Sequence, residues 1–360
     1  MKNIIFIILN FLIIHSFAND TLLHKNQNID KKVIYTFDIK EEIAPPVLRK
    51  TEKALKEAEK IKADIIIIQM NTFGGMLDAA DKIRTLLLES KIPVYVLIDN
   101  NAASAGALIS IACDSIYMRK GASIGAATVV NQTGEVLPDK YQSYMRSMMR
   151  STAETNGRNP EIAEAMVDPS VYIEGIIDSG KVLTFTTSEA IKNGFCEGTA
   201  ENISEVLKLA NIQNYEIKEQ KLTPLDKFIG FLINPIVSGI LIMIIIGGIY
   251  FELQTPGVGF PLAASITAAI LYFAPLYLEG LASNWEILVF IIGIILLAVE
   301  IFVIPGFGVT GILGITLIIS GLTLSLIDNI GFDFKGVPMN GIIKSLLTVV
   351  ISIFLGFIAS

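Results

Sequence analysis

An abrupt change in charge along the chain limits its possible folds more than any other feature of the sequence. Residues 30–225 alternate charged and apolar stretches, whereas residues 228–327 carry almost no charged side chains. The mean hydropathy of +0.58 therefore averages two halves of different character. Because long apolar stretches without charge are typical of membrane spans, the sequence predicts a soluble domain followed by a membrane domain.

Four apolar segments of the second half are long enough to cross a bilayer as helices. A hydrocarbon core of roughly 30 Å needs about 20 helical residues at about 1.5 Å each. The segments are residues 228–251, 258–278, 287–304 and 309–327, and residues 341–359, with Lys344 near their start, are a fifth candidate. Their frequent glycines favour close helix packing, so we expect an all-α, multi-helix transmembrane domain.

A short motif repeats within the membrane half. Glu252–Gly259, which reads ELQTPGVG, returns as Glu300–Gly308, which reads EIFVIPGFG. Each copy ends one predicted helix with a carboxylate and begins the next after a Pro-Gly turn. Two interpretations stay open: the copies separate helix hairpins, or their carboxylates form a pair inside the membrane.

The first residues have the pattern of a secretory signal. Lys2 precedes the apolar run 4–14, and small residues lie before a possible cleavage point after Ala18. We expect residues 1–18 to be a signal peptide and residues 19–32 to be a polar linker. A retained membrane anchor is the alternative.

Charge, histidine and cysteine counts exclude several classes of function. The net charge is −7 at pH 7, and no basic clusters occur, which argues against nucleic-acid binding. The histidines, His15 and His24, precede the predicted soluble fold, so a Ser-His-Asp triad is excluded there and a zinc site is nearly so. Cys113 and Cys196 have apolar neighbours and are either buried thiols or, in an exported domain, a disulfide. We expect neither a metal nor a cofactor.

The soluble half alternates predicted strands and helices. We expect strands at residues 33–39, 64–70, 94–99, 115–118 and 122–125, with hairpin-like strands within 171–185. We expect helices at residues 45–59, 76–89, 105–112, 138–156, 186–193 and 203–210, the helix after Thr186 beginning with a capping box. This alternation predicts an α/β domain over residues 33–215 with a largely parallel sheet.

The candidate nucleophile is Ser104, where a predicted strand turns into a helix. Its neighbours Ala103, Ala105 and Gly106 are small, which permits a sharp bend and leaves the hydroxyl exposed. The free N–H groups at a helix N-terminus suit a developing oxyanion. The alternative is that Ser104 only caps the helix. Without a histidine in the domain, the base for such a serine would be a lysine or a carboxylate.

Three short motifs in this order resemble a known superfamily. They are NTFGG at Asn71–Gly75, NNAASAGA at Asn100–Ala107 and GASIGA at Gly121–Ala126. Their order and spacing resemble those of the ClpP and crotonase superfamily. With a signal peptide before them and apolar helices after them, residues 33–327 resemble the NfeD family of membrane-bound serine proteases, also called stomatin operon partner proteins.

The resemblance implies a role for individual residues. Ser104 is the implied nucleophile, and Lys140, which follows the GASIGA run, is the implied base. Gly74 or Gly75, together with Ala105, are the implied oxyanion donors. We expect Leu137, Tyr141 and Tyr144 to form an apolar pocket that favours the neutral amine of the base. A solvated lysine at a helix start is the alternative for Lys140, and Lys120 is the rival base.

The sequence departs from the family pattern in two places. Phe73 stands where the family usually has proline, which can change the turn geometry. The long form of the family also carries a soluble β-barrel after its membrane helices, whereas this sequence stops at Ser360 in an apolar stretch. We expect either a shortened member or a truncated gene product.

The resemblance implies a membrane-bound serine endopeptidase with a Ser-Lys dyad. Its substrates would be apolar segments of stomatin- or flotillin-like membrane proteins, and it would act as a homo-oligomer, a dimer or larger. The signal peptide would place the protease domain outside the cytoplasm of a multi-pass protein of the bacterial inner membrane type, with loop 279–286 on the same side. One alternative is a non-catalytic scaffold or docking partner for such proteins. Another is an acyl-CoA enzyme of the crotonase kind, which is disfavoured because coenzyme A is not expected outside the cytoplasm.

Overall fold

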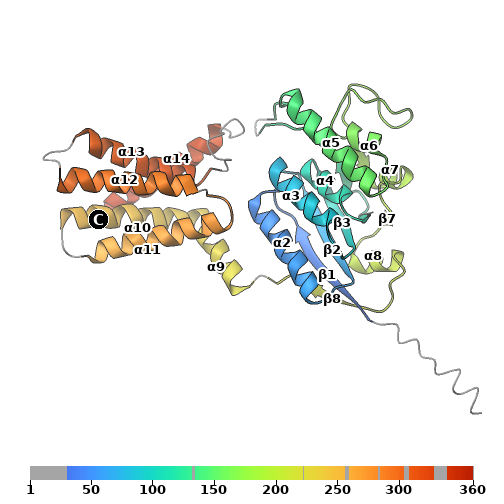
Figure 1. Cartoon of the computed structure of the whole chain (residues 1–360), viewed down its shortest axis with the longest axis horizontal. Helices are drawn as coiled ribbons and strands as arrows, with labels where there is room; N and C mark the ends of the chain where they lie inside the picture. Colours follow the sequence, from blue (N-terminus) through green and yellow to red (C-terminus); the bar gives the residue numbers. More distant parts are fainter. Residues whose placement is uncertain are drawn as a thin grey trace, which may run out of the picture.

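The computed structural model describes residues 31–131, 134–221, 223–255, 259–282, 284–303, 308–327 and 339–359. The predicted signal peptide and nearly all of the predicted linker lie outside these residues. An α/β domain and a bundle of helices lie side by side, and helix α9 (Pro224–Ile233) leads from one to the other (Figure 1).

The α/β domain is built on an 8-stranded sheet with the strand order β6-β5-β3-β2-β1-β8; in addition, β4 pairs with β3, and β7 pairs with β4. The strands are β1 (Lys32–Ile39), β2 (Ile65–Thr72), β3 (Val94–Ala103), β4 (Ser115–Met118), β5 (Ser123–Gly125), β6 (Thr184–Thr186), β7 (Gly198–Thr199) and β8 (Tyr215–Glu219). Among these strands every pairing is parallel except β5 with β6. The predicted α/β class with a largely parallel sheet is confirmed.

Helices cover both faces of this sheet, because parallel strands need crossover connections. The helices are α2 (Pro45–Lys60), α3 (Leu77–Leu88), α4 (Ala105–Ile111), α5 (Asp139–Thr155), α6 (Pro160–Ala165), α7 (Thr187–Lys192) and α8 (Ile203–Leu209). Alternate residues of β2 point to opposite faces. Ile66 and Ile68 therefore belong to the larger apolar core, and Ile65 and Ile67 belong to a second core that includes Val206 of α8.

The structure corrects the prediction for residues 171–185. The expected hairpin strands reduce to one isolated bridge between Ile173 and Ile177, and β6 at the end of the segment pairs with β5 instead. Gly180, at the centre of the expected hairpin, has a positive φ of 91°, and its N–H donates to the Pro169 carbonyl, outside the segment, and not to a partner strand within it. The predicted capping box of Thr186 and Glu189 at the start of α7 is confirmed.

In the described residues of the second half, every secondary-structure element is a helix. After α9 come α10 (Pro235–Gln254), α11 (Phe260–Leu278), α12 (Asn284–Phe302), α13 (Val309–Leu324) and α14 (Met339–Ala359). Among the described helices, α11 alone is long and apolar enough to cross a membrane as a single helix. Helices α9 and α10, which form a bent pair, are long and apolar enough when taken together.

The predicted continuous helix over residues 228–251 is wrong. The chain bends by 69° between α9 and α10, at Asn234-Pro235. Proline lacks the N–H that would continue a helix, and it pushes the preceding residue out of the helical region. Asn234 accordingly has φ −54° and ψ 131°, and its side chain caps α10 by accepting from the N–H of Ile236.

The repeated carboxylates lie between paired helices. The N–H of Gly259, before α11, donates to the Glu252 carboxylate at 3.0 Å, and the N–H of Gly308, before α13, donates to the Glu300 carboxylate. Each carboxylate thus binds the N-terminus of the following helix, where the helix dipole favours negative charge. These contacts support the interpretation that the motif separates helix hairpins.

Candidate active site

Ser104 lies at the junction of β3 and α4 in a strained backbone conformation. Its φ is 54° and its ψ is −118°, and few residues other than glycine adopt a positive φ. Its N–H donates to the carbonyl of Gly125 at 2.9 Å, which ties it to β5. The side chain makes no capping hydrogen bond to α4, so the alternative of a simple helix cap is not what the structure contains. Strain of this kind is often concentrated at active sites.

The NTFGG turn contacts the serine directly. A Cβ added at Gly74 would lie 2.6 Å from the Cβ and 3.1 Å from the Oγ of Ser104. A Cβ at Gly75 would lie 2.2 Å from the carbonyl oxygen of Ile43. Both glycines have positive φ, 112° and 152°, so any side chain here is excluded by contact and by backbone conformation together.

Backbone hydrogen bonds fix this turn from both sides. The N–H of Ile43 donates to the Gly74 carbonyl at 2.8 Å, and the N–H of Met76 donates to the Ile43 carbonyl at 2.7 Å. The N–H of Gly74 is used as well, because it donates to the Thr72 hydroxyl at 3.2 Å. Ile43 belongs to none of the sequence motifs, so its role was not predicted.

Two backbone donors beside Ser104 stay unused. In the described part of the chain, the N–H groups of Gly75 and Ala105 donate to no protein acceptor. One comes from the glycine turn and the other from the first residue of α4. Of the two glycines named as alternatives, Gly75 is thus the one with a free N–H. An oxyanion site needs donors that are fixed before the charge develops, so these two N–H groups are the candidates for that role.

Lys140 lies in the first turn of α5 and is exposed. Its Nζ lies 4.8 Å from the centre of the Tyr141 ring. Within the described residues, its amino group forms no salt bridge and no hydrogen bond, to Ser104 or to any other group.

The expected apolar pocket around Lys140 is not formed. Tyr144 is 52% exposed and its hydroxyl donates to Asp81 at 3.0 Å. The reason is the phase of α5. Gln142 and Met145 face the core, which places residues 140 and 144, one helical turn apart, on the outer face.

Gln142 is a residue of this region that the sequence did not single out. Its amide accepts from the N–H of Val129 at 3.0 Å and donates to the Val129 carbonyl at 2.6 Å. It also donates to the Leu137 carbonyl at 3.2 Å. These bonds close both ends of the segment before α5, so Gln142 fixes the point at which the helix carrying Lys140 begins.

The rival base Lys120 is exposed too. Its backbone N–H donates to Glu201 at 3.2 Å, next to the ion pair of Arg119 with Glu201 at 3.1 Å. Neither lysine is buried, so burial does not indicate which of the two is the base.

Two further predictions concern the state of the two cysteines and the absence of a metal site. Cys113 and Cys196 are free and buried, which confirms the interpretation as buried thiols. Burial raises the pKa of the Cys196 thiol to about 11, and it also raises the pKa of Cys113, so both stay protonated and unreactive at neutral pH. Among the described residues, no group of three or more His, Cys, Asp or Glu side chains could hold a metal ion.

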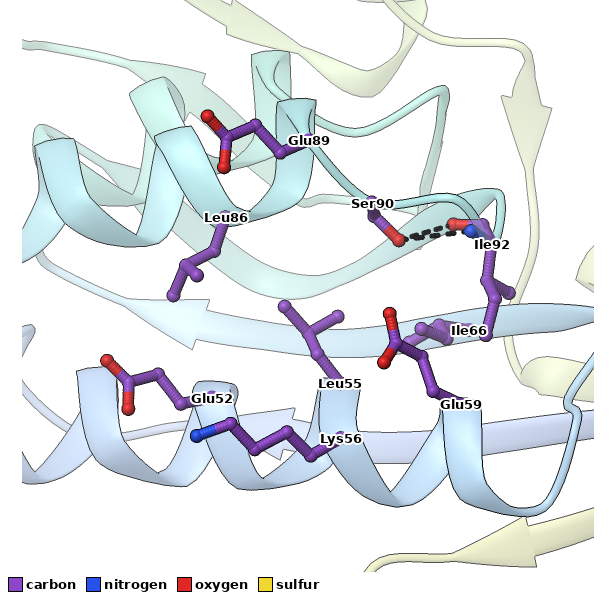
Figure 2. A pocket seen from close by; sticks show the side chains of 9 residues that line it. All are labelled: Glu52, Leu55, Lys56, Glu59, Ile66, Leu86, Glu89, Ser90 and Ile92. Carbon is purple, nitrogen blue, oxygen red and sulfur yellow. Dashed lines mark hydrogen bonds between the residues drawn. The ribbon is translucent and has the colours of Figure 1, made fainter.

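A cavity of about 380 Å³ lies between α2 and α3, away from the serine (Figure 2). Ile66, at the beginning of β2, lines its floor, and the side chains of Glu52, Glu59 and Glu89 lie around it. Ser104 follows the opposite, carboxyl end of the neighbouring parallel strand. The cavity is therefore not part of the candidate site.

Comparisons with known proteins match both halves of the chain. Residues 33–220 match the NfeD1b N-terminal domain, and residues 236–360 match the NfeD integral membrane domain. Membrane protein NfeD1b of Bacillus subtilis is 35% identical over 301 residues, which are 83% of this chain and 68% of that protein. Membrane-bound protease PH1510 of Pyrococcus horikoshii is 29% identical over 319 residues, 82% of this chain and 69% of that protein.

Two solved structures resemble part of the chain. The first is the 1510-N membrane protease of Pyrococcus horikoshii, described as specific for a stomatin homolog; it is 28% identical, with a TM-score of 0.44, over 56% of this chain and 98% of that one. The second is ClpP1 of Listeria monocytogenes, 21% identical with a TM-score of 0.38 over 50% of this chain and 97% of that one.

Proposed function

The chain belongs to the NfeD family of membrane proteins, and from that premise we propose that it is a membrane-bound serine endopeptidase. Ser104 is the nucleophile and Lys140 is the general base. The observation that carries the proposal is the strained Ser104 in contact with the glycine turn, with the N–H groups of Gly75 and Ala105 in its neighbourhood left unused. Neither a simple helix cap nor a packing role requires this arrangement.

The reaction would proceed through an acyl-enzyme. The Ser104 oxygen attacks the peptide carbonyl while its proton passes to the neutral amine of Lys140. The oxyanion accepts hydrogen bonds from the N–H groups of Gly75 and Ala105. The intermediate collapses, the amine leaves with the proton from the lysine, and water then hydrolyses the ester. A bound apolar peptide would cover the exposed Lys140, and loss of water favours the neutral amine.

Apolar peptide segments are the proposed substrates. Phe73 precedes Gly74 in the turn that touches the serine, and its side chain is 82% exposed. A phenyl ring held in water beside a nucleophile offers an apolar contact to a substrate. The Pyrococcus protease is described as specific for a stomatin homolog, so we propose the apolar segments of stomatin- or flotillin-like proteins as substrates of this chain too.

The proposed setting is a multi-pass protein with its α/β domain outside the cytoplasm, acting as a homo-oligomer. The ion pair of Arg49 in α2 with Glu279 at the end of α11 supports one element of this topology. It keeps the connection between α11 and α12 on the same side as the α/β domain.

One observation favours a second function, that of a non-catalytic scaffold for the same partners. Lys140 is exposed and has no hydrogen bond to Ser104, and a scaffold needs neither group. The Bacillus relative is named a membrane protein, without an activity. The two functions differ in whether Ser104 is required for turnover.

The test is peptide cleavage by the full chain in lipid nanodiscs. We expect Ser104→Ala and Lys140→Ala to abolish cleavage of an apolar peptide. The matched controls are Ser188→Ala, on the exposed start of α7, and Lys120→Ala. Cleavage that survives in Ser104→Ala would refute the proposal. Loss in Lys120→Ala with activity in Lys140→Ala would move the base to Lys120.

A further inference from the structure

Helix α2 is the element through which the α/β domain contacts the helical bundle. Arg49 pairs with Glu279, at the end of α11, at 2.7 Å, and Lys53 pairs with Asp226 of α9. Arg49 and Lys53 are four residues apart and share one face of α2. Figure 1 shows α2 on the side of the α/β domain that faces the bundle.

This contact is close and partly shielded from water. A Cβ added at Gly280 would lie 3.0 Å from the Cβ of Pro45, the first residue of α2. Arg49 also donates to the carbonyl of Leu278. The Glu279 side chain is 17% exposed and that of Asp226 is 23% exposed. Ion pairs shielded to this extent are screened less by salt than fully exposed ones.

At its N-terminus, α2 adjoins the residue that holds the NTFGG turn beside Ser104. Ile43, whose backbone holds Gly74 and Met76, is separated from α2 only by Ala44. Two prolines, at positions 45 and 46, then fix the backbone φ at the start of the helix. A shift of α2 is therefore transmitted to Ile43 with little flexible chain to absorb it.

Lys50, on a different face of α2, fastens the helix to the same turn. It pairs with Asp38 at 2.6 Å and with Glu41 at 2.9 Å. The Glu41 carbonyl in turn accepts from the Thr72 hydroxyl at 2.8 Å, and that hydroxyl accepts from the N–H of Gly74. Helix α2 thus reaches the turn by two routes, one through Ile43 and one through Glu41.

We propose that Arg49 and Lys53 are positioning residues, which dock α2 on the membrane domain and thereby set the place of the Gly75 N–H. The inference rests on the proposed peptidase function. Donors in an active site act only when correctly placed, and a displacement of about 1 Å can cost roughly a hundredfold in rate. The membrane domain then controls turnover and does more than anchor the protease.

The experiment measures peptide cleavage by the full chain in nanodiscs. Arg49→Glu should lower kcat about tenfold and leave KM unchanged, because the donor acts on the transition state. The double variant Arg49→Glu with Glu279→Arg should recover kcat to within about twofold of wild type, by reversing the ion pair. Lys53→Glu should also lower kcat. Asp226 is left in place because it caps α9 through Thr223.

The matched control is Lys181→Glu, which removes an exposed ion pair with Asp178 at 2.9 Å on the α/β domain. Its kcat should stay unchanged. An unchanged kcat in Arg49→Glu, or a loss that the reversed pair does not restore, would overturn the inference while wild-type activity upholds the proposed function. Absence of Ser104-dependent cleavage in the wild type would overturn both.

Discussion

Replacing Gly75 with alanine tests the proposed oxyanion donor, and the structure gives the size of the disturbance. The new Cβ would lie 2.2 Å from the Ile43 oxygen and 2.6 Å from the Ile43 nitrogen, both of which belong to the backbone. Neither can move without breaking the hydrogen bonds that hold the turn. The φ of 152° adds strain of about 1–3 kcal/mol for a residue with a side chain.

The expected loss follows from what one donor contributes. Removal of a single oxyanion donor lowers kcat about 10²–10³-fold, or about 2.7–4 kcal/mol of transition-state stabilisation. We expect a loss of this size in Gly75→Ala, with a smaller change in KM. The assay is steady-state cleavage of an apolar peptide by the full chain in nanodiscs, with denaturant unfolding of the same sample.

A matched glycine separates strain from catalysis. Gly180 also has a positive φ, 91°, but a Cβ there would meet nothing within 4 Å. Gly180→Ala should therefore lower stability somewhat and leave kcat unchanged. If Gly75→Ala keeps wild-type kcat, or if both variants lose rate in proportion to their loss of stability, the assignment of the Gly75 N–H as a donor is refuted.

Three further outcomes are expected. Phe73→Ser should raise KM about tenfold for a peptide with an apolar side chain near the scissile bond, and leave KM unchanged for a polar peptide; equal effects on both would contradict an apolar contact. Gly106→Ala should cost about 1–3 kcal/mol in denaturant unfolding, because its Cβ would lie 2.7 Å from the Thr72 Cγ2; Thr72→Ser, which removes that methyl group, should restore stability. Hydrogen bonds from the N–H of Thr186, and secondly from its hydroxyl, hold the pKa of the Glu189 carboxyl below its usual range. The capping box therefore stabilises α7 fully above about pH 4.3, the usual pKa of a glutamate. This stabilisation is lost as the pH falls through the lowered pKa. Melting of Glu189→Gln should accordingly depend less on pH between 7 and 3 than melting of the wild type.

The elements predicted correctly carry their signals locally. The apolar run of β2, the prolines that open α2, and the Thr186 capping box each fix an element from adjacent residues. The strands that were missed, β7 and β8, are short and are defined by partners far away in the chain. β8, for example, pairs with β1. Helix α6 was also missed, although it carries a local signal: Asn159 caps it and Pro160 is its first residue.

The candidate site was predictable in part for the same reason. Small residues around Ser104 marked the bend, and the positive φ at that position accords with it. The role of Ile43 depends on its pairing with Gly75, in a turn far along the chain, and no pattern in the residues around Ile43 predicts such a contact. The pocket expected around Lys140 was wrong because adjacency in sequence does not fix helix phase, and Gln142 and Met145 occupy the inner face of α5.

The most direct measurement of the central claim is mass spectrometry of the full chain trapped during turnover of an apolar peptide. We expect an acyl adduct at Ser104, on the tryptic fragment 92–119, and we expect Ser104→Ala to lack both the adduct and all cleavage products. Cleavage products that form equally in Ser104→Ala, or an adduct on another residue, would contradict that claim.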